Sequence, residues 1–173
     1  REPWPWLQAH ALPQFRALMQ SADPQPALQM AREFRLLTAL RHGPCGNETL
    51  NAQIASALRP RSDGTFHGQL VMVTQNSYAQ GLFNGDTGVV WGEGAAAQVF
   101  FQTDEGLRAW PLAQVPAHEP AWALTVHKAQ GSEFERVVWL LPDSVALVLG
   151  RDLLSHGIPR CRVRLAFWAS ARL

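Results

Sequence analysis

The stretch ALTVHKAQGSEFERVVWLLP, residues 123–142, contains a short apolar run, a dense polar segment and a second, longer apolar run. Apolar runs of this length predict buried strands. Packing explains the polar segment poorly, because it follows the carboxyl end of a buried strand, which is where open α/β sheets bind ligands. Gly131 lets the backbone approach a phosphate closely, and Lys128 supplies a cation nearby. We expect this segment to carry the function of the chain.

The elements expected before and after this segment fit an open α/β sheet that is interrupted once. Residues 34–40, FRLLTAL, predict a buried strand, and residues 48–58 predict a helix with Asn47 as its N-cap. Further strands are expected at residues 70–74, 122–126, 136–141 and 164–168, and further helices at residues 12–19, 27–32 and 145–154. Residues 86–116 contain short β-prone runs between glycine-rich turns, which predict a small antiparallel meander or barrel.

The composition limits the function classes. Of the 173 residues, 47% are hydrophobic and 17% are charged, which is typical of a compact domain with a real core. The net charge of +1 gives no global positive field, so any contact with nucleic acid must come from a local patch. Cys45 and Cys161 have no zinc-binding spacing, so we expect no metal site, and they fit a reducing, cytoplasmic environment. No apolar stretch approaches membrane-spanning length, and no membrane partner is expected.

The string TVHKAQGSEF, residues 125–134, resembles motif V of superfamily 1 DNA helicases in the form found in RecD-type enzymes. The resemblance implies that one end of this segment lies along single-stranded DNA and the other end beside ATP. The implied DNA-binding residues are Thr125, His127 and Lys128, and the implied nucleotide-binding residues are Gln130, Gly131 and Glu133. The alternative interpretation is a polar loop that only caps a helix.

Two further stretches resemble the same family. FRLLTALRHGPCGNETLN, residues 34–51, is similar to the segment with motif IV, which implies that Arg41 is a catalytic, phosphate-binding cation. The alternative is a surface arginine at a strand end. VMVTQNSYAQGLFNGDTG, residues 71–88, is similar to the segment that opens an inserted SH3-like barrel. There, Asn76 and Asn84 would contact DNA or would serve only as turn residues.

The fourth match is imperfect. LLSHGIPRCRVR, residues 153–164, occupies the place of motif VI, which implies that Arg160 is catalytic as an arginine finger on the γ-phosphate. Four residues depart from the family pattern: Ser155, His156, Pro159 and Cys161. Pro159 lacks the N–H that a helix would use, so the coupling of this motif to ATP stays open.

The resemblance covers residues 4–168 and implies a fold, a function and partners. The implied fold is α/β, an open, mostly parallel RecA-like sheet flanked by helices, with an inserted small SH3-like β-barrel. Residues 1–33 would be a helical lead-in, residues 34–85 and 120–173 the second RecA-like helicase domain, and residues 86–119 the barrel. The implied function is the C-terminal motor half of an ATP-dependent 5′-to-3′ DNA helicase within the RecBCD exonuclease V. A stand-alone RecD-type helicase is the alternative, because the distinguishing features would lie mainly in a preceding domain. Its partners would be single-stranded DNA, RecB and RecC.

The sequence has no GxxxxGK[ST] string and no Asp-Glu pair at the end of a strand of the expected α/β sheet. ATP and its Mg²⁺ would therefore need a preceding motor domain. We expect the chain, which begins with Arg1 in place of Met, to be a fragment that is inactive alone. The alternative function is a non-catalytic module that binds single-stranded DNA or a protein partner and has lost its coupling to ATP.

The seven tryptophans are further candidates for contact with DNA, because indole rings stack on nucleic acid bases. Most of them lie in apolar, strand-like runs, which favours core packing. Trp91 and Trp110, in the β-prone region, are the least settled of the seven.

Overall fold

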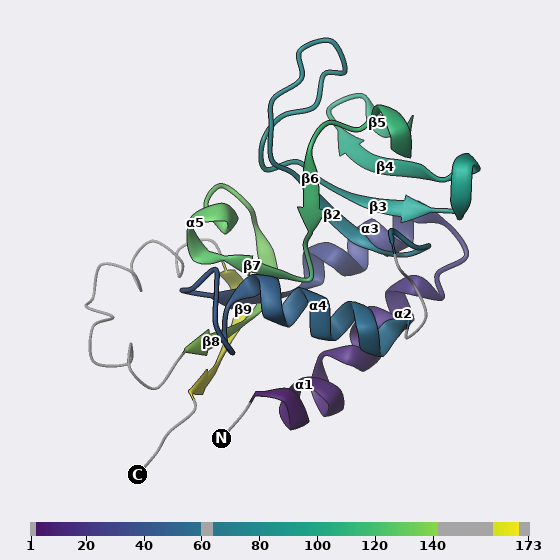
Figure 1. The fold of residues 1–173 in the computed structure, drawn as a ribbon. Helices are drawn as coiled ribbons and strands as arrows, with labels where there is room; N and C mark the ends of the chain where they lie inside the picture. Colours follow the sequence, from purple (N-terminus) through teal and green to yellow (C-terminus); the bar gives the residue numbers. More distant parts are fainter. Residues whose placement is uncertain (1–2, 60–63, 142–160, 170–173) are drawn as a thin grey trace.

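The computed structural model describes residues 3–59, 64–141 and 161–169, which form two sheets with helices packed beside them (Figure 1). One sheet is parallel, with the strand order β7-β1-β8-β9, and the other is antiparallel, with the order β5-β4-β3-β2-β6. This arrangement confirms the predicted fold class, an α/β chain with a mostly parallel sheet and a second, antiparallel β unit.

The parallel sheet consists of β1 (Phe34–Thr38), β7 (Ala123–Thr125), β8 (Phe134–Leu141) and β9 (Cys161–Ala169). All five residues of β1 are buried, as the continuous apolar run predicts for a strand covered on both faces. In the register, Thr38 lies opposite Thr125, and Leu37 lies opposite Trp139. The carboxyl ends of β1 and β7 therefore meet at one edge of the sheet.

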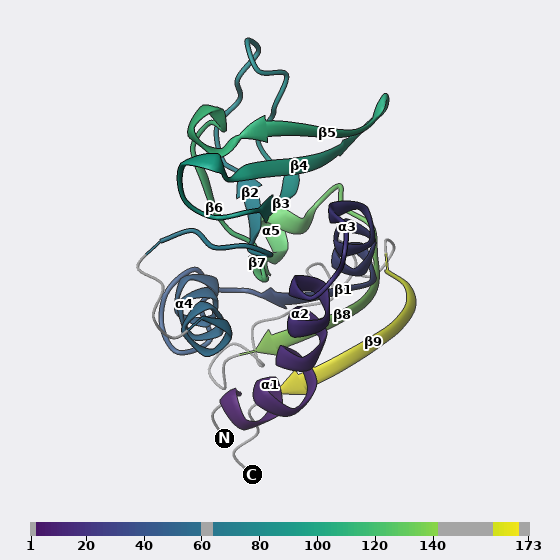
Figure 2. The same ribbon diagram turned by 90° about the vertical axis from the view of Figure 1, so that its right-hand side faces the viewer.

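The helices are α1 (Trp4–His10), α2 (Leu12–Met19), α3 (Pro24–Glu33), α4 (Asn47–Leu58) and the single turn α5 (Val126–Ala129). Helix α3 packs on β1 and β8, α4 packs on β7, and α2 contacts both α3 and α4 (Figure 2). Trp122 is fully buried in the resulting core, where its ring lies 5.6 Å from Phe66 and 6.4 Å from Phe15. No helix among these residues is long and apolar enough to cross a membrane.

The antiparallel sheet consists of β2 (Leu70–Val73), β3 (Thr87–Trp91), β4 (Gln98–Thr103), β5 (Gly106–Pro111) and β6 (His118–Pro120), with short 3-10 turns at Gly94–Ala96 and Leu112–Gln114. A strand forms at residues 70–73, as expected, but its predicted place in the α/β sheet is wrong. It is β2, which pairs with β3 and β6. Leu70 and Met72 pack into the core shared with the parallel sheet, whereas Val71 and Val73 pack into a second core within the antiparallel unit. A strand buried on both faces has the same apolar pattern in either kind of sheet.

The prediction of Asn47 as an N-cap is also wrong. Gly46 is the N-cap of α4, and Asn47 is its first residue. The reason is that the loop before the helix folds back, so that the carbonyls of Leu40 and Arg41 accept the N–H groups of Asn47 and Glu48 at 3.0 and 3.2 Å. The first turn is thus capped by backbone rather than by a side chain. The expected helix at residues 145–154 lies outside the described residues.

Candidate functional site

The polar segment after β7 forms the turn α5, and a threonine starts it. Thr125 is the N-cap, and its hydroxyl accepts the backbone N–H of Lys128 at 3.3 Å. Val126 and Ala129 are buried, while His127 is exposed. Gly131 has φ 94°, a left-handed conformation that suits glycine and turns the chain toward β8. The local sequence therefore presents His127 and Lys128 outward at the carboxyl-end edge of the sheet.

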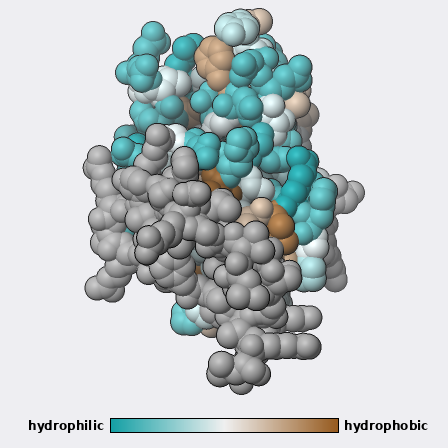
Figure 3. Space-filling view, turned by 90° about the vertical axis from the view of Figure 1, so that its left-hand side faces the viewer, coloured by the Kyte–Doolittle hydropathy of each residue, from teal (hydrophilic) through white to brown (hydrophobic). Residues whose placement is uncertain are grey.

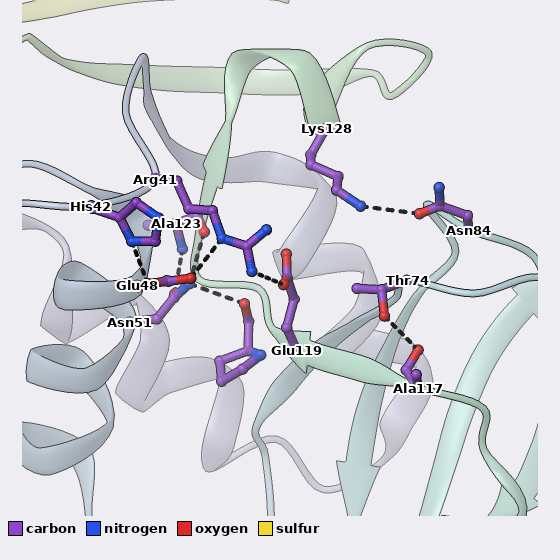
Figure 4. Close-up of polar contacts among 11 residues, drawn as sticks. Arg41, His42, Glu48, Asn51, Thr74, Asn84, Ala117, Glu119, Ala123 and Lys128 are labelled. Atoms are coloured by element: carbon purple, nitrogen blue, oxygen red, sulfur yellow. Dashed lines mark hydrogen bonds and ion pairs between the residues drawn. The ribbon is translucent and has the colours of Figure 1, made fainter.

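Lys128 reaches from α5 to the loop between β2 and β3, residues 74–86. Its Nζ donates to Oδ1 of Asn84 at 3.2 Å, across 44 positions of sequence (Figure 4). The backbone N–H of Asn84 in turn donates to Oδ1 of Asn76 at 2.8 Å. Three residues with predicted DNA contacts are thus brought together in one hydrogen-bonded chain. The side chain of Asn76 serves the turn in this structure, which matches the alternative interpretation for that residue.

Arg41 lies just past the carboxyl end of β1, at the same edge as α5 (Figure 4). Its Nε donates to Glu48 Oε1 at 2.6 Å, and its Nη2 lies 3.9 Å from Glu119 Oε2. Nδ1 of His42 is 2.8 Å from the other oxygen of Glu48. The hydrogen bond to Glu48 raises the pKa of Arg41, and the same bond keeps the pKa of Glu48 below its ordinary value. Because the Arg41 side chain is 59% exposed, this ion pair is weakly stabilising and can exchange for a phosphate.

Gly131 and Glu133 line a polar cavity of about 520 Å³ with α3, the start of β1 and the antiparallel sheet. Arg41 is not among its lining residues. Glu133 directly precedes the amino end of β8, so the cavity and Arg41 lie at opposite ends of the parallel strands. The structure therefore separates the residues with predicted nucleotide contacts into two places. Gln130, the C-cap of α5, is exposed and does not line the cavity.

The cavity also contains a cation that the sequence did not indicate, Arg35 of β1, which is 1% exposed. Its Nη1 donates to the carbonyls of Ala31 at 2.6 Å and Phe34 at 3.3 Å, and its guanidinium lies 5.3 Å from the centre of the Phe134 ring. Nε is buried without a hydrogen-bond partner among the described residues. Burial lowers the pKa of Arg35 to about 9, so the side chain is still protonated at neutral pH.

Asn51 of α4 ties the two sheets together, and sequence reasoning missed it. Its Nδ2 donates to the carbonyls of Pro120 at 3.0 Å and Ala123 at 2.9 Å, and its Oδ1 accepts the N–H of Ala123 at 2.8 Å. Glu48 and Glu119 were missed as well. Glu48 offered a signal, since it lies in the first turn of a helix, where an acidic side chain is favourable. The partners of Asn51 and Glu119 are too distant in sequence to be anticipated.

The remaining predictions on the site concern Arg160 and metal ions. Arg160 lies outside the described residues, together with most of the expected motif VI. Within residues 3–59 and 64–140, no group of three or more His, Cys, Asp or Glu side chains could hold a metal ion.

Comparison with known proteins identifies relatives, although no family model matches the chain. The chain is 38% identical over 146 residues to the RecBCD enzyme subunit RecD of Haemophilus influenzae, which covers 80% of this chain and 22% of that protein. It is 31% identical over 179 residues to RecD of Mycolicibacterium smegmatis, covering 95% and 30%. It is 32% identical over 145 residues to the ATP-dependent RecD2 DNA helicase of Deinococcus radiodurans, covering 79% and 20%. The chain thus spans less than a third of the length of each relative.

A solved structure shares the fold of this chain. The Pif1 helicase from Bacteroides, in complex with ADP-AlF3 and ssDNA, matches 94% of this chain and 45% of its own with a TM-score of 0.51. At 16% sequence identity, this match concerns the fold alone. Over most of its own length, the chain is therefore homologous to one segment of the RecBCD subunit RecD and of the RecD2 DNA helicase.

Proposed function

We propose that this chain is the C-terminal motor half of a RecD-type, ATP-dependent 5′-to-3′ DNA helicase. The similarity to proteins named RecBCD enzyme subunit RecD supports this proposal and suggests RecB and RecC as partners in the processing of double-strand breaks. The observation that carries it is the turn α5, where Thr125 caps the helix and Lys128 projects at the carboxyl-end edge of a parallel sheet. This is the edge where open α/β sheets bind their ligands.

Single-stranded DNA would lie along α5 and the neighbouring loop. Lys128 would contact a phosphate, His127 is exposed beside it, and Asn84 would exchange its bond with Lys128 for one with the strand. Because the net charge is only +1, attraction of the DNA depends on local cations such as Lys128 rather than on the field of the whole chain. Thr125 would act through the cap that orients Lys128, rather than through a free hydroxyl.

ATP would be held by the other end of the segment. Gly131, with φ 94°, and Glu133 line the polar cavity beside the buried Arg35, and Glu133 would accept a hydrogen bond from a ribose hydroxyl. Asp86 and Asp104 line the same cavity, so a phosphate there would need the cations of the lining to outweigh their charge. Arg160 would supply a further cation to this nucleotide. Arg41 lies at the other end of the parallel strands, so it would bind only a phosphate at that edge. The contribution of both arginines would be positioning and charge stabilisation. The phosphate-binding loop and the ligands of Mg²⁺ would come from residues outside this chain, which has no GxxxxGK[ST] string.

The domain division follows the two sheets. Residues 1–33 would be the helical lead-in, and the parallel strands and α4 would belong to the second RecA-like domain. The inserted SH3-like unit, which we expected at residues 86–119, would also take in β2 and the end of β6, because Leu70–Val73 and His118–Pro120 pair within the antiparallel sheet.

A second candidate is a non-catalytic module that binds single-stranded DNA or a protein partner without ATP coupling. Two observations favour it. Arg41 is already engaged by Glu48 and Glu119, and Ser155, His156 and Pro159 depart from the family pattern around Arg160. This module would bind single-stranded DNA without hydrolysing ATP.

The test is ATP hydrolysis by the whole natural protein that contains these residues, with and without single-stranded DNA. The motor predicts stimulation by DNA, with a large loss of turnover for Arg160→Ala and for Gln130→Ala. A matched control is Arg108→Ala, because Arg108 is 58% exposed on β5 and pairs only weakly with Glu105 at 3.6 Å. Wild-type protein without DNA-stimulated turnover would contradict the motor. Turnover unaffected by Arg160→Ala would exclude that residue as the finger.

A further inference from the structure

Two aromatic side chains lie on the surface of the loop between β2 and β3. Tyr78 is 83% exposed and Phe83 is 41% exposed, and no other aromatic residue stands among the exposed large hydrophobics of the described residues. Their ring centroids are 5.5 Å apart with an interplanar angle of 76°, an edge-to-face pair. Because the edge of one ring meets the face of the other, the pair still leaves ring surface open to solvent.

The loop that carries this pair is held by its own contacts. Ser77 and Leu82 exchange two backbone hydrogen bonds, at 2.7 and 3.1 Å, and Leu82 is 1% exposed in the core of the antiparallel unit. Nε1 of Trp110 donates to the carbonyl of Gln80 at 3.1 Å. Asp86 accepts the backbone N–H of Phe83 at 2.8 Å. The fold thus fixes the loop and directs the two rings outward, which gives a preorganised surface with little entropy left to lose on binding.

The surroundings of the pair suit a nucleic acid. The loop projects from the antiparallel sheet in both ribbon views (Figures 1 and 2), and residues 74–85, TQNSYAQGLFNG, include no charged side chain. The cation that touches the loop is Lys128, through Asn84. The face shown in Figure 3 is mostly hydrophilic at its upper end, with isolated hydrophobic side chains. The one charged residue of the loop, Asp86, lies at its end and accepts the N–H of Phe83. Aromatic rings beside a lysine can stack on bases while the lysine meets a phosphate.

We propose that Tyr78 and Phe83 form a base-stacking platform for unpaired bases of the strand whose phosphates meet Lys128. This inference rests on the proposed function, because it takes single-stranded DNA as the occupant. Among the described tryptophans, Trp110, Trp122 and Trp139 are buried, and the other three are partly buried and pack against the core, namely Trp4, Trp6 and Trp91. None of them is as exposed as Tyr78. Stacking uses the π-face that every base has, so the platform binds with little sequence preference.

The experiment measures the affinity of the whole natural protein for a fluorescent oligothymidylate by anisotropy. Tyr78→Ala weakens binding by about 5- to 150-fold, and Phe83→Ala weakens it by less, since Phe83 is more covered. Tyr78→Trp retains the wild-type affinity because it keeps an aromatic face. Unchanged thermal unfolding of Tyr78→Ala, expected for a side chain that is 83% exposed, excludes a folding defect.

An abasic oligonucleotide of the same length separates stacking from other contacts. The wild type binds the abasic probe more weakly than the normal oligonucleotide. On the abasic probe, Tyr78→Ala binds as tightly as the wild type does. Lys128→Ala behaves differently. Because it removes one phosphate contact, the slope of log affinity against log salt becomes less steep by about 0.7, whereas Tyr78→Ala leaves that slope unchanged. This pattern assigns the bases to Tyr78 and the phosphate to Lys128.

Several results would overturn the platform while leaving the proposed function intact. One is an oligothymidylate affinity that depends on Lys128 but not on Tyr78 or Phe83, which would assign the exposed pair to a protein partner. Another is an equal effect of Tyr78→Ala on the normal and abasic probes. If the wild type binds no single-stranded DNA, both the proposed function and the platform fail.

Discussion

Replacing Asn51 with alanine removes three hydrogen bonds at the junction of the two sheets, where β6 ends and β7 begins. Asn51 is only 4% exposed, so water does not readily replace the lost partners of Pro120 and Ala123. Each bond contributes about 1 kcal/mol net, and the buried N–H and carbonyl groups left unpaired add to the cost. We expect the free energy of unfolding to fall by about 3–5 kcal/mol, a large part of the roughly 5–15 kcal/mol typical of a folded domain.

The assay is urea unfolding followed by tryptophan fluorescence, since Trp122 is fully buried one residue before Ala123. Asn47→Ala is the matched control, because Asn47 is equally buried on the same helix but its Oδ1 has no partner among the described residues. That variant should lose less than about 1 kcal/mol. Equal losses for the two variants would refute the role of Asn51.

Asn51→Asp adds a pH test of the same geometry. The carboxylate would face the carbonyls of Pro120 and Ala123, so burial and these dipoles would raise the pKa of the new aspartate. A protonated aspartate can donate to a carbonyl, as Nδ2 of Asn51 does. Because the folded-state pKa is raised, this stabilisation is present at low pH and is lost as the pH rises through that pKa. The variant should therefore be closest to wild type in acid.

Three other perturbations follow from single contacts. The hydrogen bond with Arg41 holds the pKa of Glu48 below 4.5. The ion pair therefore stabilises the fold above that value, and this stabilisation is lost as the pH falls through the lower pKa of the folded state. Glu48→Gln should remove this part of the acid dependence in thermal melts from about pH 3 to 7. Gly88→Ala should cost about 1–3 kcal/mol in urea unfolding, because an added Cβ would lie 2.7 Å from Val99 Cγ1 and 2.8 Å from the Phe101 ring, whereas Gly64→Ala, with no atom within 4 Å, should cost far less. Arg35→Met should cost about 1–3 kcal/mol less than Arg35→Ala, because methionine fills the buried space without a charge to desolvate; equal losses would contradict this.

The parallel sheet could be predicted because its longer strands each contain an apolar run. β1 and β8 are covered on both faces, which is the pattern that the sequence shows at residues 34–40 and 136–141. The same signal misplaced β2, since Leu70 and Met72 face one core while Val71 and Val73 face another. Pairing partners depend on long-range contacts, and an apolar pattern does not encode them.

The site was predictable only where the chemistry is local. The cap of α5 by Thr125 joins residues three positions apart, so a local pattern can indicate it, although we expected a strand over residues 122–126 and a DNA contact for Thr125. The partner of Lys128 lies 44 positions away, so no local pattern reveals it. Asn47 and Asn51 lie on one helix, and no local pattern distinguishes them. Oδ1 of Asn47 has no hydrogen-bond partner among the described residues, whereas Oδ1 of Asn51 accepts the N–H of Ala123. The exposure of Tyr78 likewise depends on how Leu82 anchors the loop.

The most direct test of the proposed motor is strand displacement by the whole natural protein on a duplex with a 5′ single-stranded tail. We predict ATP-dependent displacement on this substrate and little on its 3′-tailed counterpart. Lys128→Ala should raise the concentration of protein needed for half-maximal displacement, because it removes a phosphate contact at the edge where β1 and β7 end. Binding to the tailed duplex without displacement would contradict the motor and would favour the non-catalytic module.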